Sequence, residues 1–534
     1  PATDLPNLMS GAKTWPDPFS NQNAKIDDSW HATLNGRGDF VAAQDPNEYA
    51  EALKKTLGAI SDRVASASNL SANSTSLKAD SKIFAGKYKA GVWEGELTAF
   101  DANDGSIEWI GSSGIPASPA ISRNIQTWKG SAGIPFKWAS LPAAAQTALD
   151  YDGTSGNGND DWVVEYLRGD DSHEMRKGGA LRNRNSRLGD IVHSSPVFVS
   201  YADKTKNTVY VGANDGMLHA FNANDGTERF AYIPSQFLTN GLKSLSDPNY
   251  VHRYFVDGQI AVSTSAQTAA KNLLVAAMGA GGKGLFGLDV TDPSAFTSAN
   301  VKWESASDTD MGFVLGKLFI AKLNNGQWGV ITGNGYNSAN EQSALFVYDL
   351  ETGNLIKKIN TGKGSAGATN GLTTPKGVDA DKNGTVDYIY AGDLHGYMWK
   401  FDVSSAAPAG WSSTQLFQAK DANGKPQPIT GGVAIATNPY EGPFKGMRYI
   451  MFGTGQYFNA TDAVNKDVQT WYGLIDNPST TPINGRSELA QRTITTVATS
   501  NGYKVRAFSK AVAGDMTGKK GWYVDLVVQG KANT

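Results

Sequence analysis

From about residue 82 onward, short runs of apolar, β-branched and aromatic residues alternate with turns that contain Gly, Asn and Asp. Runs of this kind, bounded by such turns, are typical of β-strands. Before this point the pattern is different, because apolar residues recur at helical spacing, at Tyr49, Leu53, Leu57 and Ile60. The pattern therefore predicts a packing helix near the start of the chain and a β-rich remainder.

The N-terminal helix is predicted to span residues 45–61. Asp45 is its candidate N-cap, Pro46 occupies the first helical position, and Glu48 completes a capping box. Residues 1–44 are rich in Pro, Asn, Asp and Gly and predict an extended, irregular lead-in, and residues 65–78 predict a linker. We expect residues 1–80 to pack, as an extended and helical segment, on the β domain of residues 81–534.

The β-rich region contains an internal repeat. Residues 95–109 and 216–230 are identical at eight of fifteen positions, and each copy predicts a strand, a four-residue turn that ends in Gly, and a second strand. Four looser copies follow, each preceded by another β-prone run, at residues 284–292, 343–353, 396–402 and 470–476. Repeated units of this kind are typical of the blades of a β-propeller.

We predict seven blades, with six and eight as alternatives. Six repeat copies are visible, and the strands near 503–509 and 521–528 predict one more blade. Closing the ring would remove exposed sheet edges. Residues 110–190 make one interval too long, so they predict an insertion on one face, with short helices at 143–149 and 162–167.

The composition narrows the classes of function. A net charge of −3 gives no sign of nucleic-acid or anionic-membrane binding. The absence of Cys excludes disulfides, thiolate metal sites and Cys nucleophiles. No apolar run is long enough for a membrane-spanning helix. Because Pro1 lies in a loop-like context and no signal peptide is present, we expect a fragment of a longer, exported chain.

The sharpest chemical motif is residues 379–387, Asp-Ala-Asp-Lys-Asn-Gly-Thr-Val-Asp. Acceptor side chains occupy alternate positions, at Asp379, Asp381, Asn383 and Asp387. Gly384 stands sixth, where a tight loop requires a positive φ. Because Ca²⁺ takes six to eight oxygen ligands, this spacing predicts a calcium site.

The loop differs from a full EF-hand. Its twelfth position is Tyr390 rather than a bidentate Glu, so Asp387 must close the site, and Thr385 would contribute its backbone carbonyl. Residues 388–391 predict a strand that leaves the loop, not a helix. The alternative is an acidic surface turn that holds no ion.

Other candidate sites are weaker. Residues 157–161, Asn-Gly-Asn-Asp-Asp, could form a second cation site, but Asp160 or Asp161 serves equally well as the N-cap of the helix that follows. The tripeptide Arg37-Gly38-Asp39 matches the sequence that integrins recognise in flexible loops, and the alternative is a simple Gly turn. A second Arg-Gly-Asp, at 168–170, predicts a helix C-cap.

The sequence gives little support for a hydrolytic enzyme. His193 precedes two serines, but the chain has no Gly-x-Ser-x-Gly or His-Glu-x-x-His motif. His219 and His395 occupy related blade positions, which favours packing near the propeller centre. We also expect four tryptophans near blade strands to belong to the core, namely Trp109, Trp303, Trp399 and Trp471.

Several longer strings resemble the C-terminal domain of the PilY family of type IV pilus tip and biogenesis proteins. They lie at 188–196, 209–221, 287–293 and 379–401, in the order found in the family. The resemblance implies a modified seven-bladed β-propeller with blades like those of quinoprotein dehydrogenases. It also implies one Ca²⁺ bound by Asp379, Asp381, Asn383, Asp387 and the carbonyl of Thr385.

The resemblance further implies a function without catalysis. In the family, calcium occupancy is linked to pilus extension and retraction, hence to twitching motility and surface attachment, and some members bind integrins through Arg-Gly-Asp. We therefore expect a cell-surface protein whose partners are type IV pilus components, such as minor pilins at the pilus tip, and a host receptor. Arg37–Asp39 is the better exposed candidate for adhesion.

The alternative is a quinoprotein dehydrogenase that uses pyrroloquinoline quinone. Such enzymes generally have eight blades, and their calcium ligands come from separated segments. Many also carry an adjacent Cys pair, which this chain lacks.

Overall fold

The computed structural model describes residues 66–72, 81–116, 122–438, 444–477, 482–500, 503–509 and 514–528, together with residues 7, 12, 14 and 512. The chain divides into two compact units, one of residues 1–66 and 89–92, the other of residues 67–88 and 93–534. The predicted helix at 45–61 and Arg37–Asp39 lie outside the described residues. The packing of residues 1–80 on the β domain therefore stays a prediction.

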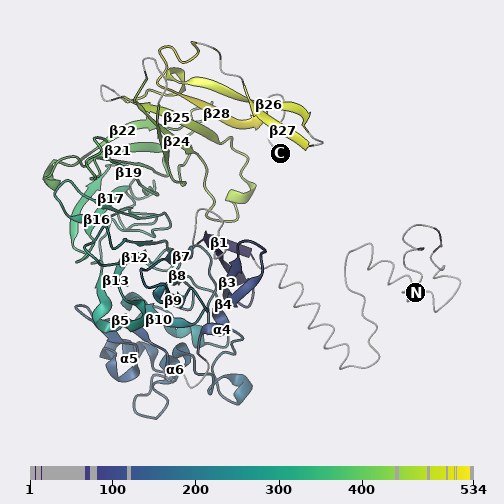
Figure 1. The fold of residues 1–534 in the computed structure, drawn as a ribbon, viewed down its shortest axis with the longest axis vertical. Helices are drawn as coiled ribbons and strands as arrows, with labels where there is room; N and C mark the ends of the chain where they lie inside the picture. The colour runs from purple at the N-terminus through teal and green to yellow at the C-terminus, as the bar shows by residue number, and fades with distance from the viewer. Residues whose placement is uncertain are drawn as a thin grey trace. The chain divides into compact units, whose positions relative to one another are not determined.

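The second unit consists of antiparallel β-sheets that follow one another in chain order (Figure 1). Four of its sheets have four strands. Sheet 1 contains β1 (Ser66–Ala72), β2 (Lys82–Lys89), β3 (Glu94–Asp101) and β4 (Ile107–Ile110). Sheet 3 contains β11 (Ile260–Val262), β12 (Leu273–Ala277), β13 (Leu285–Asp289) and β14 (Val301–Glu304). Sheet 4 contains β15 (Phe319–Lys322), β16 (Trp328–Gly333), β17 (Ala344–Asp349) and β18 (Leu355–Asn360), and sheet 5 contains β19 (Lys376–Val378), β20 (Tyr388–Gly392), β21 (Tyr397–Asp402) and β22 (Ser412–Gln418).

Sheets 2 and 6 have six strands because two further strands extend each of them. Sheet 2 has the order β6 (Gly133–Pro135), β5 (Ile125–Trp128), β10 (Glu228–Ile233), β9 (Leu218–Asn222), β8 (Thr208–Gly212) and β7 (Val197–Val199). Sheet 6 has the order β23 (Ala434–Thr437), β24 (Arg448–Gly453), β25 (Thr470–Asp476), β28 (Gly521–Val528), β26 (Ala490–Ser500) and β27 (Tyr503–Phe508). The added strand β5 pairs parallel with β10, and the added strand β26 pairs parallel with β28.

The repeat units predicted from the sequence correspond to particular strands. Each of the six copies forms the third strand of one sheet, namely β3, β9, β13, β17, β21 and β25. The propeller blades are therefore confirmed, and the described residues form six sheets, which is one of the alternative counts. The prediction that the C-terminal strands form a further blade of their own is wrong. The strands near 503–509 and 521–528 are β27 and β28, and both belong to sheet 6, where β28 pairs with β25.

Helices are short in the part of the chain that the structure describes. The α-helices are α4 (Gly111–Gly114), α5 (Ala143–Leu149), α6 (Trp162–Arg168) and α7 (Ser235–Leu238). The 3₁₀ helices are η2 (Trp138–Ser140), η3 (Met175–Lys177), η4 (Lys204–Lys206), η5 (Leu242–Ser246), η6 (Pro293–Ala295), η7 (Ser298–Asn300), η8 (Pro408–Gly410), η9 (Asp462–Val464) and η10 (Arg486–Glu488). None of the described helices has the length and apolar character needed to cross a bilayer. Both helices predicted in the insertion are confirmed, as α5 and α6.

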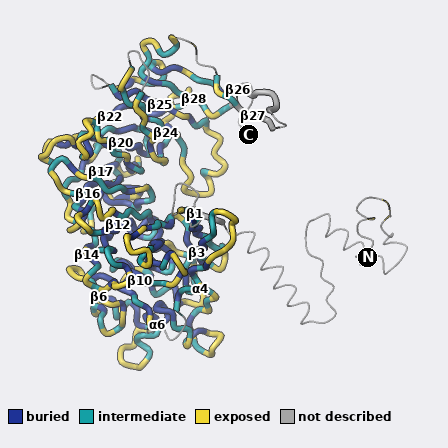
Figure 2. The backbone as a smooth tube through the Cα atoms, in the orientation of Figure 1, coloured by how far each residue is buried: buried dark blue, intermediate teal, exposed yellow. Residues whose placement is uncertain are grey.

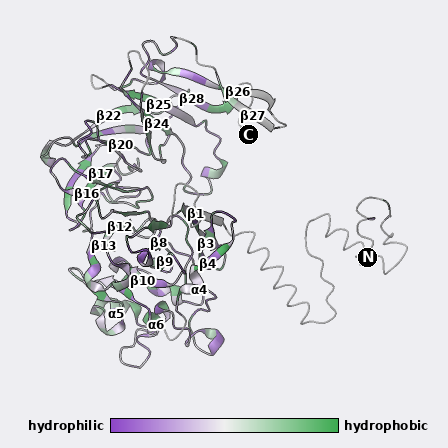
Figure 3. Ribbon diagram, viewed as in Figure 1, coloured by the Kyte–Doolittle hydropathy of each residue, from purple (hydrophilic) through white to green (hydrophobic). Residues whose placement is uncertain are grey.

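Five hydrophobic clusters join consecutive sheets, one between each pair. The two-residue period of the strands explains this arrangement. In β12, Leu274 belongs to the cluster shared with sheet 2, whereas the next residue, Val275, belongs to the cluster shared with sheet 4. The strands are buried where the connecting loops are exposed, and hydrophobic residues concentrate on strands such as β16 and β17 (Figures 2 and 3).

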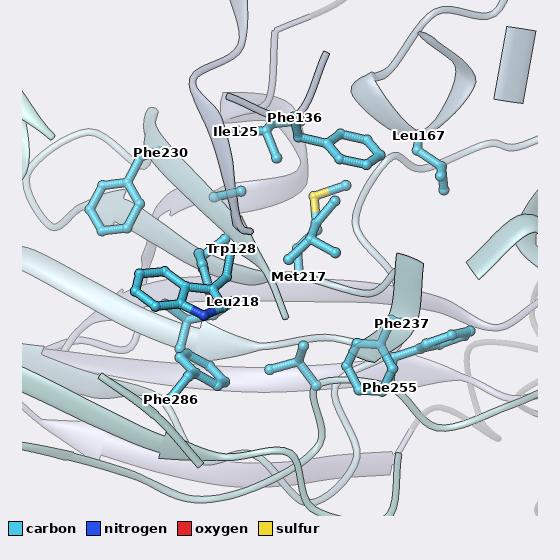
Figure 4. Packing of buried hydrophobic residues seen from close by; sticks show 14 of the residues in the cluster. Ile125, Trp128, Phe136, Leu167, Met217, Leu218, Phe230, Phe237, Phe255 and Phe286 are labelled. Atoms are coloured by element: carbon cyan, nitrogen blue, oxygen red, sulfur yellow. The ribbon is translucent and has the colours of Figure 1, made fainter. Parts of the chain in front are cut away.

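The insertion between β4 and β7 is part of the core. Ile125, Trp128 and Phe136 pack in the same cluster as Leu218 of β9 and Phe286 of β13 (Figure 4). Strands β5 and β6 were not expected, although Ile125, Thr127 and Trp128 favour β structure, because both strands are short and lie among loop-like residues. They form because the edge of β10 offers unpaired backbone groups. The insertion thus thickens the contact between sheets 2 and 3.

Buried tryptophans connect neighbouring sheets in a repeated way. The indole nitrogen of Trp109, in sheet 1, donates to the carbonyl of Ala223 at 3.1 Å, in the turn after β9 of sheet 2. Trp303, in sheet 3, donates likewise to Leu350 at 3.0 Å, in the turn after β17 of sheet 4. That turn requires Gly353, which has a φ of 69° and would place a Cβ against the Trp303 ring.

The predictions for Trp471 and for the linker at 65–78 are wrong. Trp109, Trp303 and Trp399 are buried as expected, but Trp471 is 45% exposed. Trp471 lies on β25, on the face turned away from sheet 5, and none of the five clusters covers that face.

The predicted linker at 65–78 contains β1, which pairs with β2 at the edge of sheet 1. Its backbone pairing, rather than β propensity, makes it a strand.

Candidate metal centre

The loop at residues 379–387 connects the first two strands of sheet 5. The strands β19 and β20 pair antiparallel, with Val378 opposite Tyr388, so the loop closes a hairpin. The amide of Asp387 donates to the carbonyl of Val378 at 2.9 Å, which ties the two ends of the loop together. The prediction of a strand directly after the loop is confirmed by β20.

Three predicted ligand side chains converge in this loop. Oxygen atoms of Asp379, Asp381 and Asp387 lie within 4.8 Å of one another. Asp379 and Asp381 are exposed, whereas Asp387 is only 5% exposed. The arrangement places two exposed carboxylates beside one buried carboxylate, and their mutual repulsion favours a bound cation.

Backbone amides inside the loop orient these carboxylates. Gly384 donates to Oδ2 of Asp379 at 2.8 Å, and Ala380 donates to Oδ2 of Asp387 at 2.7 Å. The amide of Asn383 donates to both Asp379 and Asp381 at 3.1 Å. The loop therefore wraps around its own carboxylates, as a short ion-binding loop must.

The tight curvature of the loop depends on two residues in the left-handed region. Gly384 has a φ of 90°, as the sequence predicted, and no other atom would meet a Cβ there. Lys382 has a φ of 65°, which costs a non-glycine residue free energy. The sequence did not reveal this second position, because Lys carries no such preference.

Asn383 and Thr385 make contacts within the loop that the spacing alone could not show. The Asn383 amide nitrogen donates to Oδ2 of Asp381 at 3.0 Å, and its oxygen accepts from the Thr385 amide at 2.8 Å. The Thr385 hydroxyl donates to the side-chain oxygen of Asn324 at 2.8 Å. Asn383 therefore supports the acidic cluster directly, and Thr385 connects it to another sheet.

Asn324 is a site residue that the sequence analysis missed. It lies in the turn between β15 and β16 of sheet 4, far from the loop in the chain, and its amide nitrogen donates to the carbonyl of Val386 at 2.8 Å. The Asn-Asn-Gly sequence at 324–326 predicts a turn but not what that turn touches. Only the packing of sheet 4 on sheet 5 brings the two together.

The donor set fits a hard divalent cation. Carboxylate, amide and carbonyl oxygens are the ligands that Ca²⁺ and Mg²⁺ prefer. The acidic side chains come from one nine-residue loop, whereas the quinoprotein alternative requires ligands from separated segments. Among the described residues, no other acidic or His cluster of this kind is found.

The other candidate sites are structural where the structure describes them. Arg168 of the second Arg-Gly-Asp is 2% exposed and donates to the carbonyl of Phe136 at 2.9 Å, while Gly169 caps α6 with a φ of 113°. In the 157–161 segment, Asp160 accepts from the Gly156 amide. Asp161 occupies the N-cap of α6 but makes no capping hydrogen bond.

His219 has the packing role predicted for it. It is fully buried in sheet 2, with Nε2 bonded to Asp215 at 2.9 Å and Nδ1 bonded to Glu228 at 2.8 Å. Burial alone would lower the pKa of His219, but the two carboxylates raise this pKa to about 9. Arg123 makes a bidentate pair with Glu228 at 2.7 Å and, with His219, lowers the pKa of Glu228 to about 2 against its burial.

Comparison with known proteins shows which family this β-propeller belongs to. The family model described as the PilY1 beta-propeller domain matches residues 186–501, more than half of the chain. The chain belongs to the PilY1 β-propeller domain family. The matched segment includes the 379–387 loop and the Asn324 turn, and it begins after sheet 1, near the C-terminal end of the insertion.

Curated relatives carry the same family name. A type IV pilus biogenesis factor PilY1 homolog of Xylella fastidiosa is 35% identical over 82% of this chain and 35% of its own length. Type IV pilus biogenesis factor PilY1 of Pseudomonas aeruginosa is 33% identical over 92% of this chain and 48% of its own length. The chain thus spans half or less of these relatives.

A solved structure supports the fold of the PilY1 domain. The crystal structure of the Pseudomonas aeruginosa PilY1 C-terminal domain is 33% identical, with a TM-score of 0.50. The similarity covers 61% of this chain and 72% of that chain. The predicted resemblance to the PilY family and the predicted propeller are therefore both confirmed.

Proposed function

We propose that this chain is the calcium-binding propeller of a type IV pilus biogenesis factor and tip-associated adhesin, acting by binding rather than catalysis. The observation that carries the proposal is the convergence of Asp379, Asp381 and Asp387 in one short loop of a PilY1-family domain. Asn383 and the carbonyl of Thr385 complete the proposed ligand set. Ca²⁺ is favoured over Mg²⁺ because a flexible loop of many oxygens suits its larger, variable coordination shell.

Calcium would act on this loop by linkage. A cation that binds the ordered loop stabilises it by RT ln(1 + [Ca²⁺]/Kd), which is about 2.7 kcal/mol at one hundred times Kd. A pilus component that contacts the ordered loop then binds according to the calcium concentration. In this way calcium occupancy would shift the balance between pilus extension and retraction, and with it twitching motility and surface attachment.

The proposed partners and location follow from the family. The names of the relatives support association with type IV pilus components, such as minor pilins at the tip, and a location at the cell surface. Adhesion to a host receptor, such as an integrin, is assigned to Arg37–Asp39, because Arg168 of the other Arg-Gly-Asp is buried.

The test is a chromosomal Asp387→Ala substitution in the native gene, assayed for surface pili and twitching with calcium and with chelator. We expect the variant to lose the difference between the two conditions. Asp421→Ala is the matched control, since Asp421 also accepts amide hydrogen bonds in an Asp-Ala-Asn-Gly turn but has no acidic neighbours in a cluster. A calcium response that persists in Asp387→Ala would refute the proposal.

A further inference from the structure

Asn324 contacts the cation loop from outside the sheet that carries it. Its amide nitrogen donates to the carbonyl of Val386 at 2.8 Å, to the carbonyl of Val403 at 3.2 Å, and to Oδ1 of Asp387 at 3.3 Å. Its oxygen accepts from the Thr385 hydroxyl at 2.8 Å. One side chain of sheet 4 therefore holds the last three residues of a loop in sheet 5.

The backbone around Asn324 reinforces this connection. The amide of Val386 donates to the carbonyl of Lys322 at 2.9 Å, which joins the end of β15 to the loop. Leu323 and Val386 are both buried in the cluster between sheets 4 and 5. The turn at 322–327 and the C-terminal half of the loop thus form one packed unit across two blades.

We propose that Asn324 is the positioning residue of the cation site, and that it couples cation binding to the 322–327 turn of the preceding blade. This inference rests on the proposed function, because it assumes that the loop binds calcium. Asn324 fixes both Asp387, the buried carboxylate, and Thr385, whose carbonyl is a proposed ligand. Outer contacts of this kind hold ligands in place before the ion arrives, and removing them typically weakens metal binding 10- to 100-fold.

The coupling has a direction that the contacts define. Asp387 and the Thr385 carbonyl would hold the ion, and Asn324 bonds to both of these residues. Its own turn is tied to Val386 by the backbone, so a cation that orders the loop would also order the turn. At the other end of the loop, Asp379 and Asp381 accept hydrogen bonds from amides of the loop itself, so the coupling would run through the C-terminal half.

The neighbouring residue offers a matched control. Asn325 lies in the same turn, but its side chain bonds only to Gln327 of that turn. Asn325→Ala therefore removes a turn contact without touching the loop, whereas Asn324→Ala removes the contacts to the loop. Thr385→Val is a second test variant, because it keeps the proposed carbonyl ligand and removes the hydroxyl, which lies 2.8 Å from the side-chain oxygen of Asn324 and 2.5 Å from that of Asn383.

The experiment measures calcium affinity of the chelator-stripped chain by competition with a chromophoric chelator. We expect Asn324→Ala to weaken binding about tenfold or more, Thr385→Val to weaken it less, and Asn325→Ala to leave it within about twofold. In the double variant Asn324→Ala with Thr385→Val, the loss of affinity is expected to be smaller than the sum of the two single losses, because the two changes share one contact, while Thr385→Val also removes the contact to Asn383.

Hydrogen–deuterium exchange on the same proteins supplies a second readout. In the wild-type chain, calcium should slow amide exchange in both the loop and the 322–327 turn; in Asn324→Ala it should slow exchange in the loop alone. Wild-type affinity in both Asn324→Ala and Thr385→Val would overturn the inference and leave the calcium site standing. A wild-type chain that binds no calcium would overturn the proposed function as well.

Discussion

At the scale of residues, the chain distinguishes two kinds of charged cluster. The Arg123–Glu228–His219–Asp215 cluster is buried and balanced, because each carboxylate meets a cation. The cluster of Asp379, Asp381 and Asp387 has three carboxylates, and among the described residues their hydrogen-bond partners are backbone and side-chain amides. The charges of the buried cluster therefore balance one another, whereas the cluster in the loop has an excess of negative charge that a bound cation would balance.

The balanced cluster makes the stability of the fold depend on pH. The folded pKa of His219, about 9, exceeds its usual value near 6.5, so the stabilisation by the charged imidazole is complete below about pH 6.5 and is lost as pH rises through about 9. We expect His219→Gln to cost about 3–5 kcal/mol at pH 6.5, because it leaves Asp215 without its cationic partner and removes one of the two cations that pair with the buried Glu228. The difference from wild type should shrink at pH 10, as measured by urea unfolding. An equal difference at both pH values would contradict this assignment.

At the scale of elements, the tryptophan contacts between sheets determine how strongly neighbouring blades are joined. Trp303 fills the interface of sheets 3 and 4 and bonds to Leu350, whereas Trp471 is half exposed on sheet 6. We expect Trp303→Ala to destabilise the chain by about 3–5 kcal/mol. Trp471→Ala is the matched control, and it should cost far less in the same denaturant titration. Similar losses for the two variants would show that burial of Trp303 does not hold the sheets together.

Elements that repeat could be predicted from the sequence, and elements that depend on a distant edge could not. The third strands of all six sheets were predicted because the repeat motif marks them. Strand β1 carries no strong β pattern, and β5 has only four residues, so their formation depends on pairing with β2 and β10, which lie elsewhere in the chain. The C-terminal strands were predicted as strands but assigned to the wrong sheet, since local sequence does not specify a pairing partner.

In the candidate site too, the features set by local sequence could be predicted, and those set by distant residues could not. The spacing of acceptors in 379–387 predicted the three converging carboxylates and the positive φ at Gly384. The contribution of Asn324 could not be predicted, because it depends on which turn of sheet 4 faces the loop. A short loop thus specifies its own ligands, while the packing of two blades decides how firmly they are held.

At the scale of the whole molecule, five hydrophobic clusters hold the six sheets, and the cation loop lies in none of them except through Val386. Calcium should therefore change the order of the loop and its neighbouring turn without changing the fold. This separation would allow the proposed response to calcium while the sheets remain assembled. A partner that contacts sheets 4 and 5 near the loop would detect the ion, and the remaining sheets would serve as a rigid support.

The most direct test of the account is a calorimetric titration of calcium into the purified, chelator-stripped chain, with Asp387→Ala and Asp421→Ala alongside. The account predicts one calcium site per chain in the wild type, retained in Asp421→Ala and lost in Asp387→Ala, with unchanged far-ultraviolet circular dichroism in all three. No binding in the wild type, or the same binding in Asp387→Ala, would contradict the central claim that the 379–387 loop is a calcium site.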